Sequence, residues 1–391
     1  MRRTSLAVGL VLLTTSTATA CMWDYDTLRQ ERARFPGTLE LITGKFLRHS
    51  KEFYQWRIED RLRRLQSDPK NAALYDDLAV AYEKTGQNAK AIATMLKVEE
   101  FQPGRYETYS NLATFYFLGG QFQLALDTVN KALAINPDAH FGREKYQKYL
   151  TEYVISRLKD GKVVLPLEAG EQLGHSKRFA SFLLNATQPK GTVALPDAET
   201  LAALKGVKGM MRFAYHDSPV LLEVLGDLLS GDVYSPNSDA KQLAARAYIK
   251  ASMNVADQRA KDEYLKKARG VLAMQIKLQG GHGPIALEQV QAELAIESDD
   301  AVRWFDDLRN REIGWIRDGA DPESEFDKLY DREPEVIGNT LFAEAIERLR
   351  KPESKILIAF VVFVAVSLLA LRIVWIVVRR LVSRQKPPPA T

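Results

Sequence analysis

Residues 71–103 read NAALYDDLAVAYEKTGQNAKAIATMLKVEEFQP, and residues 105–137 read RYETYSNLATFYFLGGQFQLALDTVNKALAINP. Aligned so that Leu78 stands over Leu112, the two stretches share residue types at matching positions. The shared pairs include Leu78 and Leu112, Ala79 and Ala113, Tyr82 and Tyr116, Gly86 and Gly120, Ala91 and Ala125, and Pro103 and Pro137. All these pairs have the same separation in the sequence. A fixed period of this length, with apolar residues at helical spacing, predicts stacked helix–turn–helix units.

Each repeat divides into two predicted helices. The expected helices cover residues 72–85 and 88–101 in the first repeat, and 106–118 and 122–135 in the second. Gly86 and Gly120 suit the left-handed residue that often ends a helix, and Pro103 and Pro137 stop the second helices. Small alanines stand where the paired helices would cross, because a larger side chain there would push the pair apart.

These residues resemble the tetratricopeptide repeat family over residues 71–137. Its signature residues are matched by the aromatic residues Tyr75 and Tyr109, the leucine–alanine pairs, the tyrosines that follow, the alanines of the second helices and the closing prolines. Val98 departs from the alanine usual in the family, whereas Ala132 keeps it. The resemblance implies an α-helical solenoid that binds other proteins.

In that family, the first helices of successive repeats line a groove for a partner. By family position, the groove residues would be Asp76, Val80, Glu83, Ser110, Thr114 and Phe117. Family members that grip a C-terminal carboxylate carry lysine and asparagine where Asp76 and Val80 stand, so this departure argues against such a ligand. A mixed polar and aromatic groove fits an extended or helical protein segment. The alternative is that this face packs against residues 22–66 or against the later helices.

The segments around the repeats are also predicted to be helical, so the fold class is all-α. An N-terminal helical segment covers residues 21–66 and contains one long helix over 45–66, and residues 138–157 form a helix that caps the repeats. Residues 158–355 form a further all-helical domain, in which residues after Pro219 resemble degenerate repeats; the alternative is a non-repeating helical domain. Expected helices there include 198–204, 206–215, 285–297 and 299–318, with the acidic run 297–300 capping the last one.

The N-terminus predicts export. Residues 1–20 combine Arg2, Arg3, a short apolar run and small residues before Cys21, as in a secretory signal peptide. Cleavage after residue 20 would make Cys21 the first residue. This arrangement is similar to a bacterial lipoprotein signal, in which the cysteine is lipidated; a plain N-terminal cysteine is the alternative.

The C-terminus predicts membrane attachment. Residues 356–378 are apolar except for Ser367 and Arg372, and are long enough to cross about 30 Å of hydrocarbon as a helix. The tail 379–391 carries four basic residues and no acidic one, so we expect it to stay in the cytoplasm. Together with the export signal, this places residues 21–355 on the periplasmic side of the inner membrane.

Composition and motifs argue against several classes of function. Seven of the 54 basic residues, and no acidic residue, lie in residues 1–21 and 356–391, so the body has a net charge of −3 and nucleic acid is not an expected partner. One cysteine excludes an intramolecular disulfide. None of the five histidines has a second histidine three or four residues away, and no phosphate loop or serine-hydrolase motif occurs, so no enzyme, metal or cofactor is predicted.

The sequence therefore predicts a non-enzymatic scaffold, anchored in the inner membrane by residues 356–378, that binds a protein partner on the periplasmic side. Two alternatives remain. One is an envelope enzyme with its site within residues 158–290, where His282 lies in a glycine-rich loop. The other is a cytosolic adaptor anchored by its C-terminal tail, which requires that residues 1–20 are not cleaved.

Overall fold

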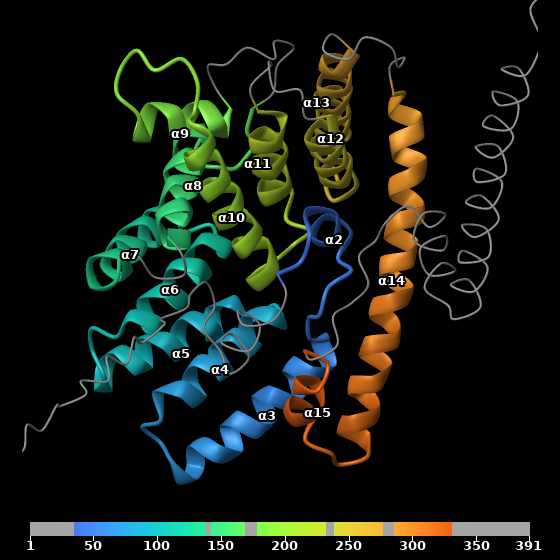
Figure 1. Ribbon diagram of the computed structural model, residues 1–391. Coiled ribbons are helices and arrows are strands. Elements are labelled where there is room, and N and C mark those ends of the chain that lie inside the picture. Colours follow the sequence, from blue (N-terminus) through green and yellow to red (C-terminus); the bar gives the residue numbers. More distant parts are fainter. Residues whose placement is uncertain (1–34, 138–141, 169–177, 232–237, 277–284, 331–391) are drawn as a thin grey trace, which may run out of the picture. The chain divides into compact units, whose positions relative to one another are not determined.

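The computed structural model describes residues 35–137, 142–168, 178–231, 238–276 and 285–330, and within them the regular elements are helices (Figure 1). Strand-like pairing in these ranges is limited to one isolated bridge between Lys159 and Lys162. The predicted all-α fold class is therefore confirmed for the described residues. The predicted signal peptide, Cys21, the membrane helix 356–378, the tail 379–391 and His282 lie outside them.

The helices are α2 (Thr38–Thr43), α3 (Lys51–Ser67), α4 (Ala72–Lys84), α5 (Asn88–Phe101), α6 (Tyr106–Leu118), α7 (Phe122–Ile135), α8 (Arg143–Arg157), α9 (Phe179–Thr187), α10 (Asp197–Phe213), α11 (Pro219–Ser230), α12 (Ser238–Met253), α13 (Gln258–Ile276), α14 (Leu287–Arg317) and α15 (Pro322–Asp327). No helix of the described residues combines the length and apolar character required to cross a membrane.

The two repeats form helix pairs at the predicted positions, α4 with α5 and α6 with α7. Gly86 has a φ of 83° and Gly120 a φ of 74°, the left-handed conformation that ends a helix at little steric cost in glycine. In each turn the amide of the residue after the glycine bonds to a tyrosine carbonyl near the end of the first helix, that of Tyr82 or Tyr116, at 2.8 Å. Ala79 and Ala113 of the first helices are fully buried, as expected for close helix crossings.

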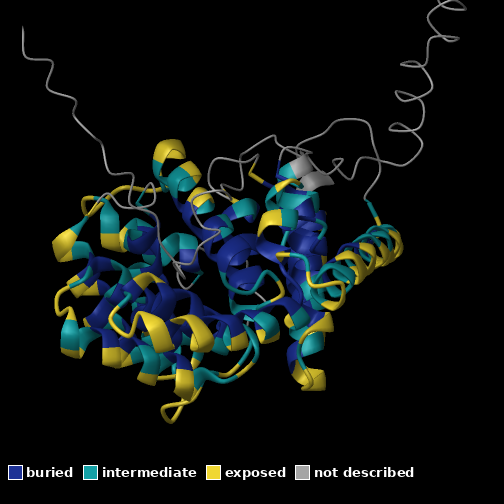
Figure 2. Cartoon of the chain, turned by 90° about the horizontal axis from the view of Figure 1, so that it is seen from below, coloured by how far each residue is buried: buried dark blue, intermediate teal, exposed yellow. Residues whose placement is uncertain are grey.

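Helices that follow one another in the chain pack side by side from α3 to α8, and the row continues through α10, α11, α12 and α13. Helix α14 contacts α2, α3, α12, α13 and α15, so it joins the beginning of this row to its end. One hydrophobic cluster occupies the space between α3, α4, α5 and α6, and a larger one extends over α2 and α8 to α14. Figure 2 shows these buried parts surrounded by exposed helix faces and turns.

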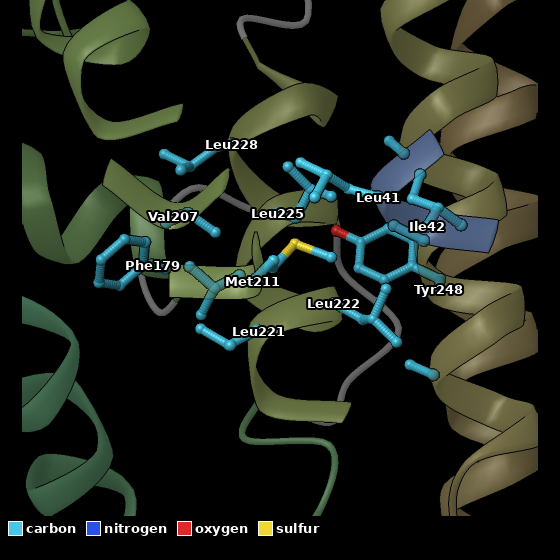
Figure 3. Packing of buried hydrophobic residues seen from close by; sticks show 14 of the residues in the cluster. Leu41, Ile42, Phe179, Val207, Met211, Leu221, Leu222, Leu225, Leu228 and Tyr248 are labelled. Atoms are coloured by element: carbon cyan, nitrogen blue, oxygen red, sulfur yellow. The ribbon is translucent and has the colours of Figure 1, made fainter. Parts of the chain in front are cut away.

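The larger cluster depends on residues far apart in the sequence. Helix α2 contributes Leu41 and Ile42, which lie beside Tyr248 of α12 in Figure 3. Gly226 of α11 permits the close approach of Tyr248, since a Cβ at that position would lie 2.6 Å from the tyrosine ring. Helices α11 and α12 thus pack as a tight pair, and their origin as degenerate repeats stays a prediction.

Three predicted helix boundaries were wrong. Helix α3 begins at Lys51, not at residue 45, because the Ser50 side chain caps it by accepting a bond of 3.2 Å from the Phe53 amide. Residues 198–204 and 206–215 were expected to form two helices, but α10 continues through Gly206. Residues 285–297 and 299–318 form the single helix α14, because the acidic run is in its interior and pairs with other elements, including Lys45 through Asp300.

Candidate functional site

The six residues predicted to line a partner groove lie on the first helices of the repeats, on a side that we call the inner face. Five of them are buried, with Asp76 and Ser110 fully inaccessible, and Phe117 is partly buried. The structure therefore places these side chains among contacts with neighbouring elements. A role for them in partner binding stays a prediction.

Asp76 of α4 forms a paired contact with Arg105, the residue before α6. The two guanidinium nitrogens Nη1 and Nη2 donate to the two carboxylate oxygens at 2.7 and 2.6 Å. Burial raises the pKa of Asp76 to about 7, and the bonds from Arg105 oppose this rise. This contact links the first helices of the two repeats and leaves neither carboxylate oxygen open to a ligand.

Glu83 is held at the other end of α4. Its carboxylate accepts a bond of 2.7 Å from the Asn88 side chain, and its backbone carbonyl accepts one of 2.9 Å from the Tyr215 hydroxyl. In the second repeat the equivalent pair is Phe117 and Phe122, whose rings meet edge to face at 5.4 Å. A polar contact in one repeat is thus replaced by an aromatic contact in the other.

The rest of the inner face is covered by three segments from outside the repeats. Val80 shares a cavity wall with Phe46 and Phe213, and the Thr114 hydroxyl accepts a bond of 3.2 Å from Gln147 of α8. Residues 46–54 and 212–216 pack against α4 here, which corresponds to the alternative arrangement considered for this face. A partner segment would have to displace these contacts to reach it.

A second face of the first repeat is open. A groove of about 460 Å³ runs over α4 between α3 and α5, and we call it the α3–α5 groove. Its lining includes Leu62, Leu65, Tyr75, Leu78, Tyr82, Lys90, Ala93 and Lys97. Leu62 at one wall is 46 % exposed, so its apolar surface is accessible at the groove.

The groove has an aromatic floor and a cationic edge. The Lys90 ammonium lies 5.3 Å from the centre of the Tyr82 ring, and the Lys97 ammonium lies 5.1 Å from that of Tyr75. Such contacts hold the lysines beside the apolar floor. The groove therefore offers an apolar surface of ligand-pocket size with positive charge along α5.

The family model described as Tetratricopeptide repeat matches residues 72–105. The chain contains a tetratricopeptide repeat. Proteins of this family generally use the repeat as a non-catalytic scaffold that binds other proteins. No curated protein and no solved structure matches the chain.

The matched tetratricopeptide repeat includes α4 and α5, which supply most of the α3–α5 groove. The sequence carries a signal for this groove, because Tyr75, Leu78 and Tyr82 recur at spacings of three and four and share one helix face. The sequence gives no sign that α3 and α5 would each pack against α4 and leave this face of α4 open between them. No group of three or more potential metal ligands occurs in the part of the chain that the structure describes.

Proposed function

We propose that this protein is a membrane-anchored tetratricopeptide-repeat scaffold that binds a protein partner through the α3–α5 groove. The observation that carries the proposal is the open groove itself, about 460 Å³ in volume and formed largely by the matched repeat. The inner face, in contrast, already holds the contacts of residues 46–54 and 212–216. A partner can enter the groove without displacing any part of the described chain.

The groove favours a partner segment with apolar side chains flanked by carboxylates. Tyr75, Leu78 and Tyr82 form a floor that can accept aliphatic or aromatic side chains, and Leu62 adds apolar surface at the wall. The two lysines of α5 stand along the opposite wall and would attract acidic residues. An apolar centre with a charged rim is the usual composition of a protein interface.

The placement of the scaffold is part of the proposal and rests on the sequence. Residues 1–20 have the pattern of an export signal, and residues 356–378 that of a membrane helix, so residues 21–355 would lie on the periplasmic side. Attachment to the membrane raises the effective concentration of the groove toward other membrane-attached proteins. Protease added outside spheroplasts would then degrade the body, whereas protection of the body would contradict this placement.

Site-specific photo-crosslinking tests the binding surface in the full-length protein. A photoreactive residue at position 62 should give an adduct with a defined second protein, because Leu62 lines the groove. The matched control is position 201, since Leu201 of α10 is 66 % exposed and lies outside the groove. Lys97→Glu should weaken the adduct at position 62 at least several-fold by repelling a partner carboxylate. Equal adducts at positions 62 and 201, or an adduct unaffected by Lys97→Glu, would contradict the proposal.

A further inference from the structure

A small cavity lies behind the inner face of α4, away from the α3–α5 groove. Its volume is about 60 Å³, and its walls come from residues 46–49, α3, α4 and the end of α10 with the turn that follows. A water molecule needs about 10 to 15 Å³ measured in this way, so the cavity has room for about four. A phosphate or carboxylate group is of this size.

The charged residues lining this cavity are basic. Arg48, Lys84 and Arg212 contribute three cationic side chains, and His216 and His49 contribute two imidazoles. No aspartate or glutamate is among the described residues of its wall. The cations come from the segment after α2, from α4 and from α10, so the fold itself brings them to one place.

Neighbouring contacts fix the positions of two of these cations. The Arg48 guanidinium stacks on the Phe305 ring, 3.6 Å from its centre, and donates to the Gly44 carbonyl. Lys84 donates to the carbonyl of Ala214 in the turn after α10. Groups held in this way keep their charges at the cavity without further loss of side-chain freedom when an anion enters.

Three carboxylates lie near these cations, but none of them lines the cavity. Glu312 accepts bonds from the His49 ring at 2.6 Å and from the Ser50 amide at 2.8 Å. Asp217 is exposed; burial lowers the pKa of both Arg48 and Lys250, and the charge of Asp217 opposes this lowering. The third, Glu83, interacts with the charge of Lys84. The local balance remains positive, because the four cations, the three of the cavity wall and Lys250, outnumber these three acids.

Two residues of the cavity wall have lowered pKa values, and burial is the main cause for both. Burial lowers the pKa of Arg48 to about 10. The pKa of His216 is lowered well below its usual value by burial, and next by the charges of Arg48, Lys250 and Lys84. An imidazole that stays neutral beside several cations indicates a positive potential at the cavity.

We propose that this cavity binds a small oxyanion, either a phosphate or a carboxylate group, between Arg48, Lys84 and Arg212. Guanidinium groups match the oxygen geometry of both anions, and the lysine acts as a point charge. His216 would become an additional donor once an anion beside it favours its protonated form. Because the three cations belong to separate segments, the bound anion would hold these segments together and stabilise the folded state.

The test uses the purified full-length protein, titrated with inorganic phosphate and, separately, with acetate at constant ionic strength. Binding is followed by calorimetry and by the nuclear magnetic resonance signals of His216. We expect saturable binding of at least one anion by the wild type and at least tenfold weaker binding by Lys84→Met. Lys84→Arg should restore most of the affinity, since it restores the charge. The matched control is Lys131→Met, which removes the same charge from helix α7, outside both the cavity and the α3–α5 groove, and should bind like the wild type.

Comparing phosphate with acetate shows which of the two chemical groups the cavity binds. Preference for phosphate would assign the site to phosphate groups, and equal or stronger acetate binding would assign it to carboxylates. Either result should be accompanied by a higher pKa of His216 in the bound state. Phosphate also stabilises proteins without binding, but that effect would be the same in Lys84→Met and Lys131→Met. Equal affinity in these two variants, or no saturable binding of either anion by the wild type, would overturn the proposal.

Discussion

Helix α4 presents two faces that differ in residue type and in what covers them. The inner face carries Asp76 and Glu83, both buried and each bonded to a named partner. The face toward the α3–α5 groove carries Tyr75, Leu78 and Tyr82 beside an open concavity. The two carboxylates are held by contacts within the protein, whereas Tyr75 and Leu78, although themselves only 5 % and 3 % exposed, form the floor of the groove. The contrast identifies the apolar face as the one available to a partner.

The two repeats differ from each other at matching positions of their inner faces. Asp76 has Arg105 as its partner, whereas Ser110, the matching residue of the second repeat, is buried where the first repeat has an ion pair. Glu83 contacts its neighbour on the second helix through a hydrogen bond, whereas Phe117 makes the equivalent contact through its ring. The residue types that the two repeats share at matching positions give both the same helix pair, and the inner-face residues differ according to what covers each repeat.

The largest effect should come from removing the partner of the buried carboxylate. Arg105→Met leaves Asp76 without its two charged hydrogen bonds in the interior. Breaking a buried ion pair in this way typically lowers the free energy of unfolding by about 3 to 5 kcal/mol, and we expect that range at pH 8 in urea denaturation. The double variant Asp76→Leu with Arg105→Met should recover part of the loss. A double variant no more stable than Arg105→Met would contradict the account of an uncompensated charge.

The loss in Arg105→Met should also depend on pH. In the wild type the pKa of Asp76 is already raised to about 7 by burial, and without Arg105 it would rise further. A group whose pKa is higher in the folded state holds an extra proton there, so its stability contribution is lost as the pH rises. Above pH 7 the variant should therefore lose up to about 1.4 kcal/mol per pH unit relative to the wild type. An equal difference at pH 5 and pH 8 would contradict this.

An intermediate effect is expected from His216, behind the inner face. Its pKa is depressed in the folded state, so its contribution to stability is present above the unfolded value of about 6.5 and is lost as the pH falls. The free energy of unfolding of the wild type, measured without phosphate or acetate, should fall by about 1 kcal/mol from pH 6.5 to 5.5 relative to His216→Gln. Parallel pH profiles of the two proteins would contradict a His216 that stays neutral in the folded state.

The repeats could be predicted because their signal is local and periodic. Leu78, Ala79 and Gly86 recur at the same positions of the second repeat, and each is required by a helix crossing or a helix end. The covering of the inner face could not be predicted in detail, because it depends on contacts such as that of Tyr215 with Glu83, 132 residues apart. The continuous helix α14 was missed for another reason: a run of acidic residues is also the signature of a helix start.

The smallest effect, and the sharpest comparison, comes from two lysines at equivalent positions. Lys97 lies 5.1 Å from the Tyr75 ring centre and Lys131 lies 5.4 Å from that of Tyr109, so both repeats contain the same contact. Lys97→Met and Lys131→Met should each lower the free energy of unfolding by about 0.5 kcal/mol, because both contacts are solvent-exposed. Only Lys97 lines the α3–α5 groove, so only Lys97→Met should also weaken the photo-crosslink at position 62. If both substitutions weakened the crosslink equally, the difference in binding between the two repeats would be refuted even though their stabilities matched.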